Sequence, residues 1–364
     1  MPDIARELNV GTGYLAHLTS IIQLGFITGT LIFAIFNIAD LISPSRVFFA
    51  CSVVAASANL AISLGGIDIT RLMELRFLTG FFLAGIYPVG MKVASDHYSG
   101  RLGRSLGFLV GALVLGTAFP HLIKGATITL PWRYVIYSTS LLCLLGGSAM
   151  LVLVPDGPFR RKGAKLRLSA FLYNFKQKEF RAIALGYFGH MWELYTFWMF
   201  VPIMLAAHQA RYHDTYSVPL TSFVVIASGS IACVISGVVS QRFGAKKTAT
   251  FALTLSGTCC LASPLAFLTG STALLIAFLL VWGMAVIADS PLFSTLVAQN
   301  APPESRGTSL TIVNCIGFAI TIVSIQLINA VKTEENSGYV YMALAIGPAL
   351  GLVSLLRNRR TAVQ

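Results

Sequence analysis

The sequence is poor in charged residues and contains no long polar region. Asp, Glu, Lys and Arg make up 11% of its 364 residues, whereas a typical soluble domain carries about 25%. The longest polar stretch, residues 155–181, is too short to build a soluble core of its own. These deficits exclude a soluble enzyme and a nucleic-acid-binding protein.

The chain is rich in long apolar stretches. Hydrophobic residues make up 55% of the chain, and the mean hydropathy is +0.76. Eleven apolar stretches of about 18–26 residues approach the length that crosses a bilayer. They lie at 15–36, 47–64, 72–91, 105–123, 134–154, 182–207, 218–239, 248–269, 272–293, 308–331 and 339–356. The short alternating segments of a barrel are absent, so the sequence predicts an all-α polytopic membrane protein with 11 transmembrane helices.

The net charge of +12 is distributed unevenly across this topology. Of the 26 Lys and Arg residues, 19 fall on one predicted face and 7 on the other. The positive-inside rule makes the richer face cytoplasmic and places the C-terminus there. The basic charge therefore marks a membrane face and does not indicate nucleic acid. We expect a multi-pass monomer in the lipid bilayer of the cell (inner) membrane.

Signals for secretion, disulfides and cofactors are lacking. Residues 1–13 contain no apolar core of a signal peptide. All six cysteines lie within apolar stretches, which favours packing over disulfide formation. No set of residues with metal-ligand spacing is present, so the sequence predicts neither a metal site nor a cofactor.

Several short patterns recur about 202 residues apart. They are Leu18-Thr19-Ser20 with Leu220-Thr221-Ser222, Asp40 with Gln241, Pro88 with Pro291, and Ser105-Leu106 with Ser309-Leu310. The recurrence predicts two related halves, residues 1–154 and 182–364. The basic stretch 155–181 would join them as a solvated cytoplasmic linker, or would contact lipid headgroups.

The two halves differ by one apolar stretch. The second half holds six and the first only five, and the counterpart of 182–207 would precede Met1. We therefore expect that the chain lacks its first transmembrane helix, through a misplaced start codon or a real truncation.

A loop motif in the second half resembles a motif of the major facilitator superfamily. Residues 237–247 read Gly-Val-Val-Ser-Gln-Arg-Phe-Gly-Ala-Lys-Lys, similar to the superfamily pattern Gly-x-x-x-Asp-Arg-x-Gly-x-Arg-Arg except at Gln241. The first copy keeps Asp40 and a later Arg46, but Phe36 replaces the first glycine and the middle glycine is lost. Arg76-Phe-Leu-Thr-Gly80 resembles the fourth-helix pattern Arg-x-x-x-Gly.

The resemblance covers nearly the whole chain and implies a fold and a function. The fold would be two six-helix halves with the first helix missing. The function would be secondary active transport of a small solute by alternating access, with the general look closest to prokaryotic cyanate- or nitrate-type carriers. Two other classes are a non-transporting sensor or inactive truncated carrier, and a membrane enzyme. The sequence shows no metal or nucleophile constellation for the enzyme.

The loop motif implies a conformational switch at the cytoplasmic face. Asp40 would accept hydrogen bonds from Arg101 and Arg104 in one conformation and release them in the other. The alternative is a solvated helix end that contributes under about 1 kcal/mol. In the second copy the corresponding switch residues are Gly237, Arg242 and Gly244.

Ionisable residues inside the apolar stretches or directly at their ends predict the substrate and proton pathway, because such groups usually face a cavity or a partner. They are Arg76, Lys92, His190, Glu193 and Asp289. In the twelve-helix scheme these lie on helices 4, 7 and 10, which line the central cavity of the superfamily. The basic residues on helix 4 make a small anionic solute plausible. Lys92 lies near the cytoplasmic end, where snorkelling is the alternative.

His190 and Glu193 are three residues apart and share one helical face. Glu193 would lie about 17 Å into the membrane, where it could carry a proton or form a hydrogen-bonded structural pair with His190. Asp289 precedes Pro291, which matches Pro88, so the pair predicts helix breaks in both halves. Asp289 would bind a proton or cation, or would cap the break.

Glycines at every fourth position, Gly103, Gly107 and Gly111, predict close packing of one helix against a neighbour.

Overall fold

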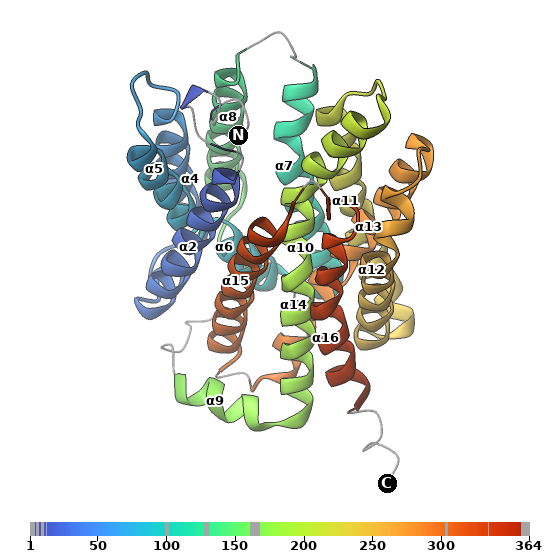
Figure 1. Cartoon of the computed structure of the whole chain (residues 1–364). Coiled ribbons are helices and arrows are strands. Elements are labelled where there is room, and N and C mark those ends of the chain that lie inside the picture. Colours follow the sequence, from blue (N-terminus) through green and yellow to red (C-terminus); the bar gives the residue numbers. More distant parts are fainter. Residues whose placement is uncertain are drawn as a thin grey trace. The chain divides into compact units, whose positions relative to one another are not determined.

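The computed structural model, shown in Figure 1, describes residue 4, residues 7–8, 11, 13–98, 102–126, 131–160, 168–302, 305–333 and 335–357. Within these ranges every regular element is a helix. The chain forms two compact units: residues 1–102 with 128–168, and residues 103–127 with 169–364. We call them unit 1 and unit 2.

Unit 1 is built on two pairs of closely packed helices, α2 with α5 and α4 with α8. Its helices are α2 (Tyr14–Ile35), α3 (Ile38–Leu41), α4 (Pro44–Ala61), α5 (Ile69–Leu83), α6 (Tyr87–His97) and α8 (Arg133–Leu153). At one end of the unit, Ile4 is buried with Leu18, Ile62 and Leu72 in a small apolar cluster.

Unit 2 surrounds one long helix, α10, which spans 35 residues. Its helices are α7 (Leu102–Ala126), α9 (Leu168–Lys176), α10 (Lys178–Tyr212), α11 (Val218–Phe243), α12 (Ala245–Phe267), α13 (Thr272–Ala288), α14 (Ser290–Asn300), α15 (Arg306–Val331), the 3₁₀ helix η2 (Val340–Ala345) and α16 (Ile346–Arg357). Aromatic side chains of α10, among them Phe197 and Phe200, are buried in the main apolar core. In Figure 1, α9 lies across the beginning of α10.

The predicted apolar stretches coincide with helices to within a few residues at most ends, and two of the stretches are broken. Stretch 72–91 forms α5 and α6, and stretch 272–293 forms α13 and α14. Pro88 and Pro291 stand in the first turn of α6 and of α14, where proline is tolerated because the N–H it lacks has no helical acceptor. The prediction of paired helix breaks is confirmed.

Nine helical segments of the described chain are long and apolar enough to span a membrane, with α5–α6 and α13–α14 each counted as one. Helices α4 and α10 are not among the nine. The weaker apolar signal of α10 fits its buried polar residues, which include His190 and Glu193. The polytopic fold stands, and the count of eleven spans stays a prediction.

The internal repeat includes a specific contact between two helices, which is found in both units. A Cβ atom added to Gly80 on α5 would overlap the carbonyl oxygen of Ile22 on α2. A Cβ atom added to Gly283 on α13 would lie 2.6 Å from the carbonyl oxygen of Val225 on α11. Both members of the second contact lie 203 residues after those of the first, so the same helix crossing is built twice.

Helix α10 has no counterpart among the described helices of unit 1. The prediction of a helix ahead of Met1 stays a prediction.

The glycines of α7 bring this helix close to α11, as their spacing predicts. Added Cβ atoms at Gly107 and Gly111 would each lie 3.0 Å from a carbonyl oxygen of α11, at Cys233 and Ser230 respectively. Helix α7 therefore packs in unit 2, although the repeat assigns it to the first half of the sequence.

The predicted solvated linker is packed at both of its described ends. Just after α8, the carboxylate of Asp156 accepts a hydrogen bond from the hydroxyl of Ser43 at 2.7 Å. On α9, the buried amide of Asn174 donates to the hydroxyls of Ser305 and Ser309, at 2.8 and 3.0 Å. The chain on either side of residues 161–167 is therefore held in place by specific contacts.

Candidate functional site

A buried contact between a histidine and a carboxylate connects α10 to the break between α13 and α14. The Nδ1 atom of His190 lies 2.8 Å from Oδ1 of Asp289, and both side chains are 1% exposed. Asp289 is the residue between the two helices, and its carbonyl oxygen accepts from the N–H groups of Leu292 and Phe293. The break thus places a carboxylate directly opposite a histidine of the central helix.

Glu193, one turn further along α10, makes a different set of contacts. Its Oε1 atom accepts from Nε1 of Trp282 at 2.6 Å and from the thiol of Cys260 at 3.2 Å. Its Oε2 atom accepts from the hydroxyl of Ser256 at 2.9 Å. The alternative of a hydrogen bond between His190 and Glu193 is not formed, because Glu193 has its partners on α12 and α13 and His190 faces Asp289 at the helix break.

Further polar contacts fix the rotation of α10 about its axis. Tyr187 donates to Oδ1 of Asn314 at 2.7 Å, and Thr196 donates to the hydroxyl of Ser324 at 2.9 Å. Thr321 donates to the carbonyl oxygen of Met191 at 2.8 Å. Since α10 is held on α15 at three heights, His190 and Glu193 are presented in fixed directions.

Unit 1 holds two buried polar groups beside the contact of Gly80 with Ile22. Gln23 follows Ile22, is 5% exposed, and meets no hydrogen-bond partner among the described residues at either end of its amide. Arg76 lies one turn before Gly80, and its Nε atom is likewise buried without a partner within the described chain. Leaving a buried donor without a partner costs about 1–3 kcal/mol, so each of these two groups needs an explanation, such as a bound ligand, ion or water.

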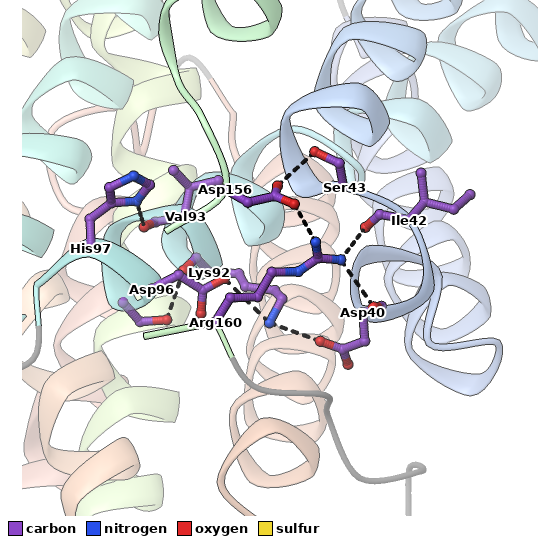
Figure 2. Close-up of polar contacts among 10 residues, drawn as sticks. Asp40, Ile42, Ser43, Lys92, Val93, Asp96, His97, Asp156 and Arg160 are labelled. Carbon is purple, nitrogen blue, oxygen red and sulfur yellow. Dashed lines mark hydrogen bonds and ion pairs between the residues drawn. The ribbon is translucent and has the colours of Figure 1, made fainter. Parts of the chain in front are cut away.

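Asp40 pairs with a lysine. Figure 2 shows Nζ of Lys92 on α6 reaching the carboxylate of Asp40 at the end of α3, with an Nζ–Oδ1 distance of 2.8 Å. Lys92 also lies 3.6 Å from Oδ2 of Asp96. Lys92 therefore bridges two carboxylates, which supports a role at the helix ends beyond snorkelling.

The start of the linker is bound to the same cluster. The guanidinium of Arg160 donates to the carbonyl oxygens of Asp40 and Ile42, at 3.1 and 3.0 Å, and contacts Asp156 (Figure 2). Asp156 accepts from the hydroxyl of Ser43 at 2.7 Å. One arginine thus connects the segment after α8 to the turn between α2 and α4.

The remaining predicted switch residues have local roles or lie elsewhere. Arg101 is outside the described residues. Arg104 belongs to unit 2 and lies over the ring of Phe108, 5.9 Å from its centroid, while Arg242 lies over Phe243 at 5.4 Å. Gly237 faces the backbone of Gly103 on α7.

Gly244 ends α11 with a φ of +87°, a conformation that other residues adopt only with strain. The second copy of the loop motif is therefore a tight turn between α11 and α12. Neither this turn nor the described part of the chain as a whole contains a group of three or more His, Cys, Asp or Glu side chains suited to a metal.

The sequence predicts several of the buried polar residues, but it does not predict which side chains they contact. Gln23 carries a signal, since it is a lone amide in the apolar stretch 15–36. Asp156 and Arg160 also carry one, because an acid and a base four residues apart flank a Gly-Pro turn. Trp282, Ser256 and Cys260 carry none, since each is an ordinary residue of an apolar helix until the fold brings it to Glu193.

Comparison with known proteins agrees with the helical architecture. The structure is similar to the crystal structure of the human organic anion transporter MFSD10 (TETRAN), with a TM-score of 0.72 and 14% sequence identity. The match covers 96% of this chain and 87% of that one. No curated protein matches the sequence significantly. Residues 1–325 match the sequence profile of the Major Facilitator Superfamily, and the chain therefore belongs to that superfamily of transporters.

Proposed function

We propose that the chain is a proton-coupled secondary carrier of a small anionic solute, working by alternating access. The buried pair of His190 and Asp289 is the observation that carries the proton coupling. A titratable pair 1% exposed is costly to bury and is retained mainly where its charge is used. Its place at a helix break matches the midplane binding sites of secondary transporters.

Arg76 supports the anionic class of solute. Its guanidinium is a permanent cation on α5, and its buried Nε atom meets no partner in the described chain. Gln23, with a free amide, flanks the same helix contact. A carboxylate or a small oxyanion would satisfy both donors, since guanidinium groups bind such oxygens in a bidentate manner. The similar human protein is described as an organic anion transporter.

The pair of Asp40 and Lys92 is the proposed conformational switch. The two side chains are about one-fifth exposed, so the ion pair contributes under about 1 kcal/mol to stability. A pair that weak is easily broken and re-formed during transport. Gly237, Arg242 and Gly244 would shape the corresponding turn in unit 2, without the acidic partner.

The cytoplasmic C-terminus and the location in the cell (inner) membrane are part of the same proposal. Basic residues are concentrated on the face that would hold the linker and the C-terminus. A fluorescent protein fused after Gln364 would fold only on the cytoplasmic side, whereas a periplasmic alkaline phosphatase fused there would be inactive. The opposite pattern would overturn the orientation.

Uptake into proteoliposomes tests the function directly. The purified chain would be reconstituted, and the uptake of labelled nitrate, cyanate, formate, acetate and benzoate would be followed with and without an inward proton gradient. We expect at least one anion to accumulate only with the gradient. Arg76→Leu should abolish that uptake and Arg76→Lys should retain part of it. Facilitated exchange without proton-driven accumulation would refute coupling, and equal uptake by Arg76→Leu would refute the anion site.

A further inference from the structure

The two buried carboxylates of unit 2 differ in how completely their hydrogen-bonding capacity is used. Glu193 accepts three hydrogen bonds, from Trp282, Cys260 and Ser256, and is 0% exposed. The indole N–H of Trp282 can only donate, and it cannot turn to follow a moving carboxylate because the ring is packed against Phe197 at 4.7 Å. Glu193 is therefore held in one place from two neighbouring helices.

The pair of His190 and Asp289 retains free capacity. Nδ1 of His190 faces Oδ1 of Asp289 at 2.8 Å. The other ring nitrogen, Nε2, and the second carboxylate oxygen, Oδ2, are buried and meet no hydrogen-bond partner among the described residues. If Nδ1 carries the proton shared with Asp289, Nε2 is the ring atom at which a second proton can be gained or lost.

We propose that Nε2 of His190 is the atom that takes up and releases the transported proton. Asp289 is its counter-ion and Glu193 is a positioning residue. This inference rests on the proposed proton coupling and assigns it to one atom. Uptake forms the Nε2–H bond and converts neutral imidazole to imidazolium. Asp289 stays a carboxylate, so the pair changes from one net negative charge to none. Release breaks the same bond and leaves Nδ1–H in place.

The other titratable groups around His190 are already engaged. Tyr187, whose ring centroid is 6.0 Å from that of His190, donates its hydroxyl to Asn314. Cys233 on α11 points its thiol at the carbonyl oxygen of Ile287, at 3.6 Å. On α14, the neighbour is the uncharged ring of Phe293, 6.2 Å away. Asp289 is thus the charged partner that the described structure offers to this histidine.

Nitrogen NMR of the purified protein tests the assignment without knowledge of the solute. The six histidines would be labelled with ¹⁵N in their rings, and His190→Gln would assign the His190 signals by their loss. We expect Nδ1 to stay protonated across the pH series, while Nε2 changes from protonated to free as the pH rises. A His190 ring that keeps one protonation state throughout would overturn the inference.

Two further variants separate the roles of the carboxylates. Asp289→Asn should abolish this change at Nε2, because the imidazolium loses its counter-ion. Glu193→Gln should keep the transition while lowering the melting temperature, since it disturbs only the fixing contacts. Loss of the transition in a folded Glu193→Gln protein and its persistence in Asp289→Asn would reverse the assignment.

The proteoliposome assay distinguishes failure of this inference from failure of the proposed function. Proton-driven anion uptake by the wild type, together with a His190 that does not titrate, overturns the inference alone. A titrating His190 in a protein without proton-driven uptake overturns the proposed coupling, and with it the claim that this proton is transported.

Discussion

The two repeated helix crossings, α2 with α5 and α11 with α13, share a backbone arrangement and differ in the polar groups they carry. In each, a glycine lets two helix backbones touch, Gly80 at Ile22 and Gly283 at Val225. Arg76 and Gln23 flank the first contact. The residues 203 positions later are Leu279 and Ile226, which are fully buried in the apolar core of unit 2.

The helix breaks show the reverse pattern. Pro88 and Pro291 each stand near the start of the second helix. Asp289 occupies the break in unit 2, and the residue 203 positions earlier is Ile86. The groups that we propose for transport therefore lie where the repeat is not kept: a cation at the crossing of unit 1, and an acid at the break of unit 2. The close helix contacts are common to both units, whereas each of these polar groups occurs in one unit only.

Exchanging the side chains at the crossing should give the largest effect. Leu279→Arg would bury a guanidinium in an apolar core without a partner, at a cost of about 4–5 kcal/mol or more, so little folded protein should be recovered. Arg76→Leu should fold at least as well as the wild type, because it removes an unpaired buried donor, but should lose anion uptake. Size-exclusion chromatography measures how much folded protein each variant gives, and proteoliposomes measure its anion uptake. A well-folded Leu279→Arg protein would show that the crossing in unit 2 tolerates a buried arginine as the crossing in unit 1 does.

Adding one methyl group at each crossing should give the next largest effect. Gly80→Ala and Gly283→Ala would each push two helix backbones apart, at a cost of about 1–3 kcal/mol. Gly80→Ala should be the worse, because its Cβ atom would come closer to the facing carbonyl oxygen. Gly146→Ala on α8 is the matched control, with nothing within 4 Å of the added atom. The melting temperatures of the three variants in detergent test this order. Equal melting temperatures would mean that the helices move apart at no cost.

The sequence predicts the helices well because length and hydropathy decide them locally. Pro88 and Pro291 give the breaks for the same reason, since a proline acts on its own helix. The partners were much less predictable. The loop motif predicts that Asp40 binds Arg101 and Arg104. In the described structure Asp40 pairs with Lys92 instead. The spacing of His190 and Glu193 allows a pair between them, yet Glu193 bonds to α12 and α13, and His190 faces Asp289 at the helix break. Such pairings depend on how helices rotate against one another, which no local pattern specifies.

Breaking the ion pair of Asp40 should have a moderate effect on transport and a small one on stability. Asp40→Asn should slow uptake several-fold while changing the free energy of unfolding by under about 1 kcal/mol, because the pair is partly exposed. The double variant Asp40→Lys with Lys92→Asp should recover part of the rate, since the attraction is restored with its sign reversed. Initial uptake rates and insertion levels test this. Unchanged uptake by Asp40→Asn would mean that Asp40 is only a solvated helix end without a role in switching. Unit 2 has Gln241 at the corresponding position of the motif.

The smallest effect concerns Glu7, which binds the N-terminal segment of unit 1 to the start of α8. Its carboxylate accepts from Nε1 of Trp132 and from the guanidinium of Arg133, both at 2.7 Å. The hydrogen bond from Trp132, aided by the charge of Arg133, holds the pKa of Glu7 below its usual value.

A lowered pKa fixes the sign of the pH dependence. The stabilisation by Glu7 is fully present above the unfolded pKa of about 4.3, and is lost as the pH falls through the folded value. The melting temperatures of the wild type and Glu7→Gln should therefore differ at pH 7 and converge in acid. Glu74→Gln, which removes an exposed carboxylate of α5, is the control and should show no such convergence. A difference that persists unchanged below about pH 3 would mean that Glu7 stabilises unit 1 through packing instead of charge.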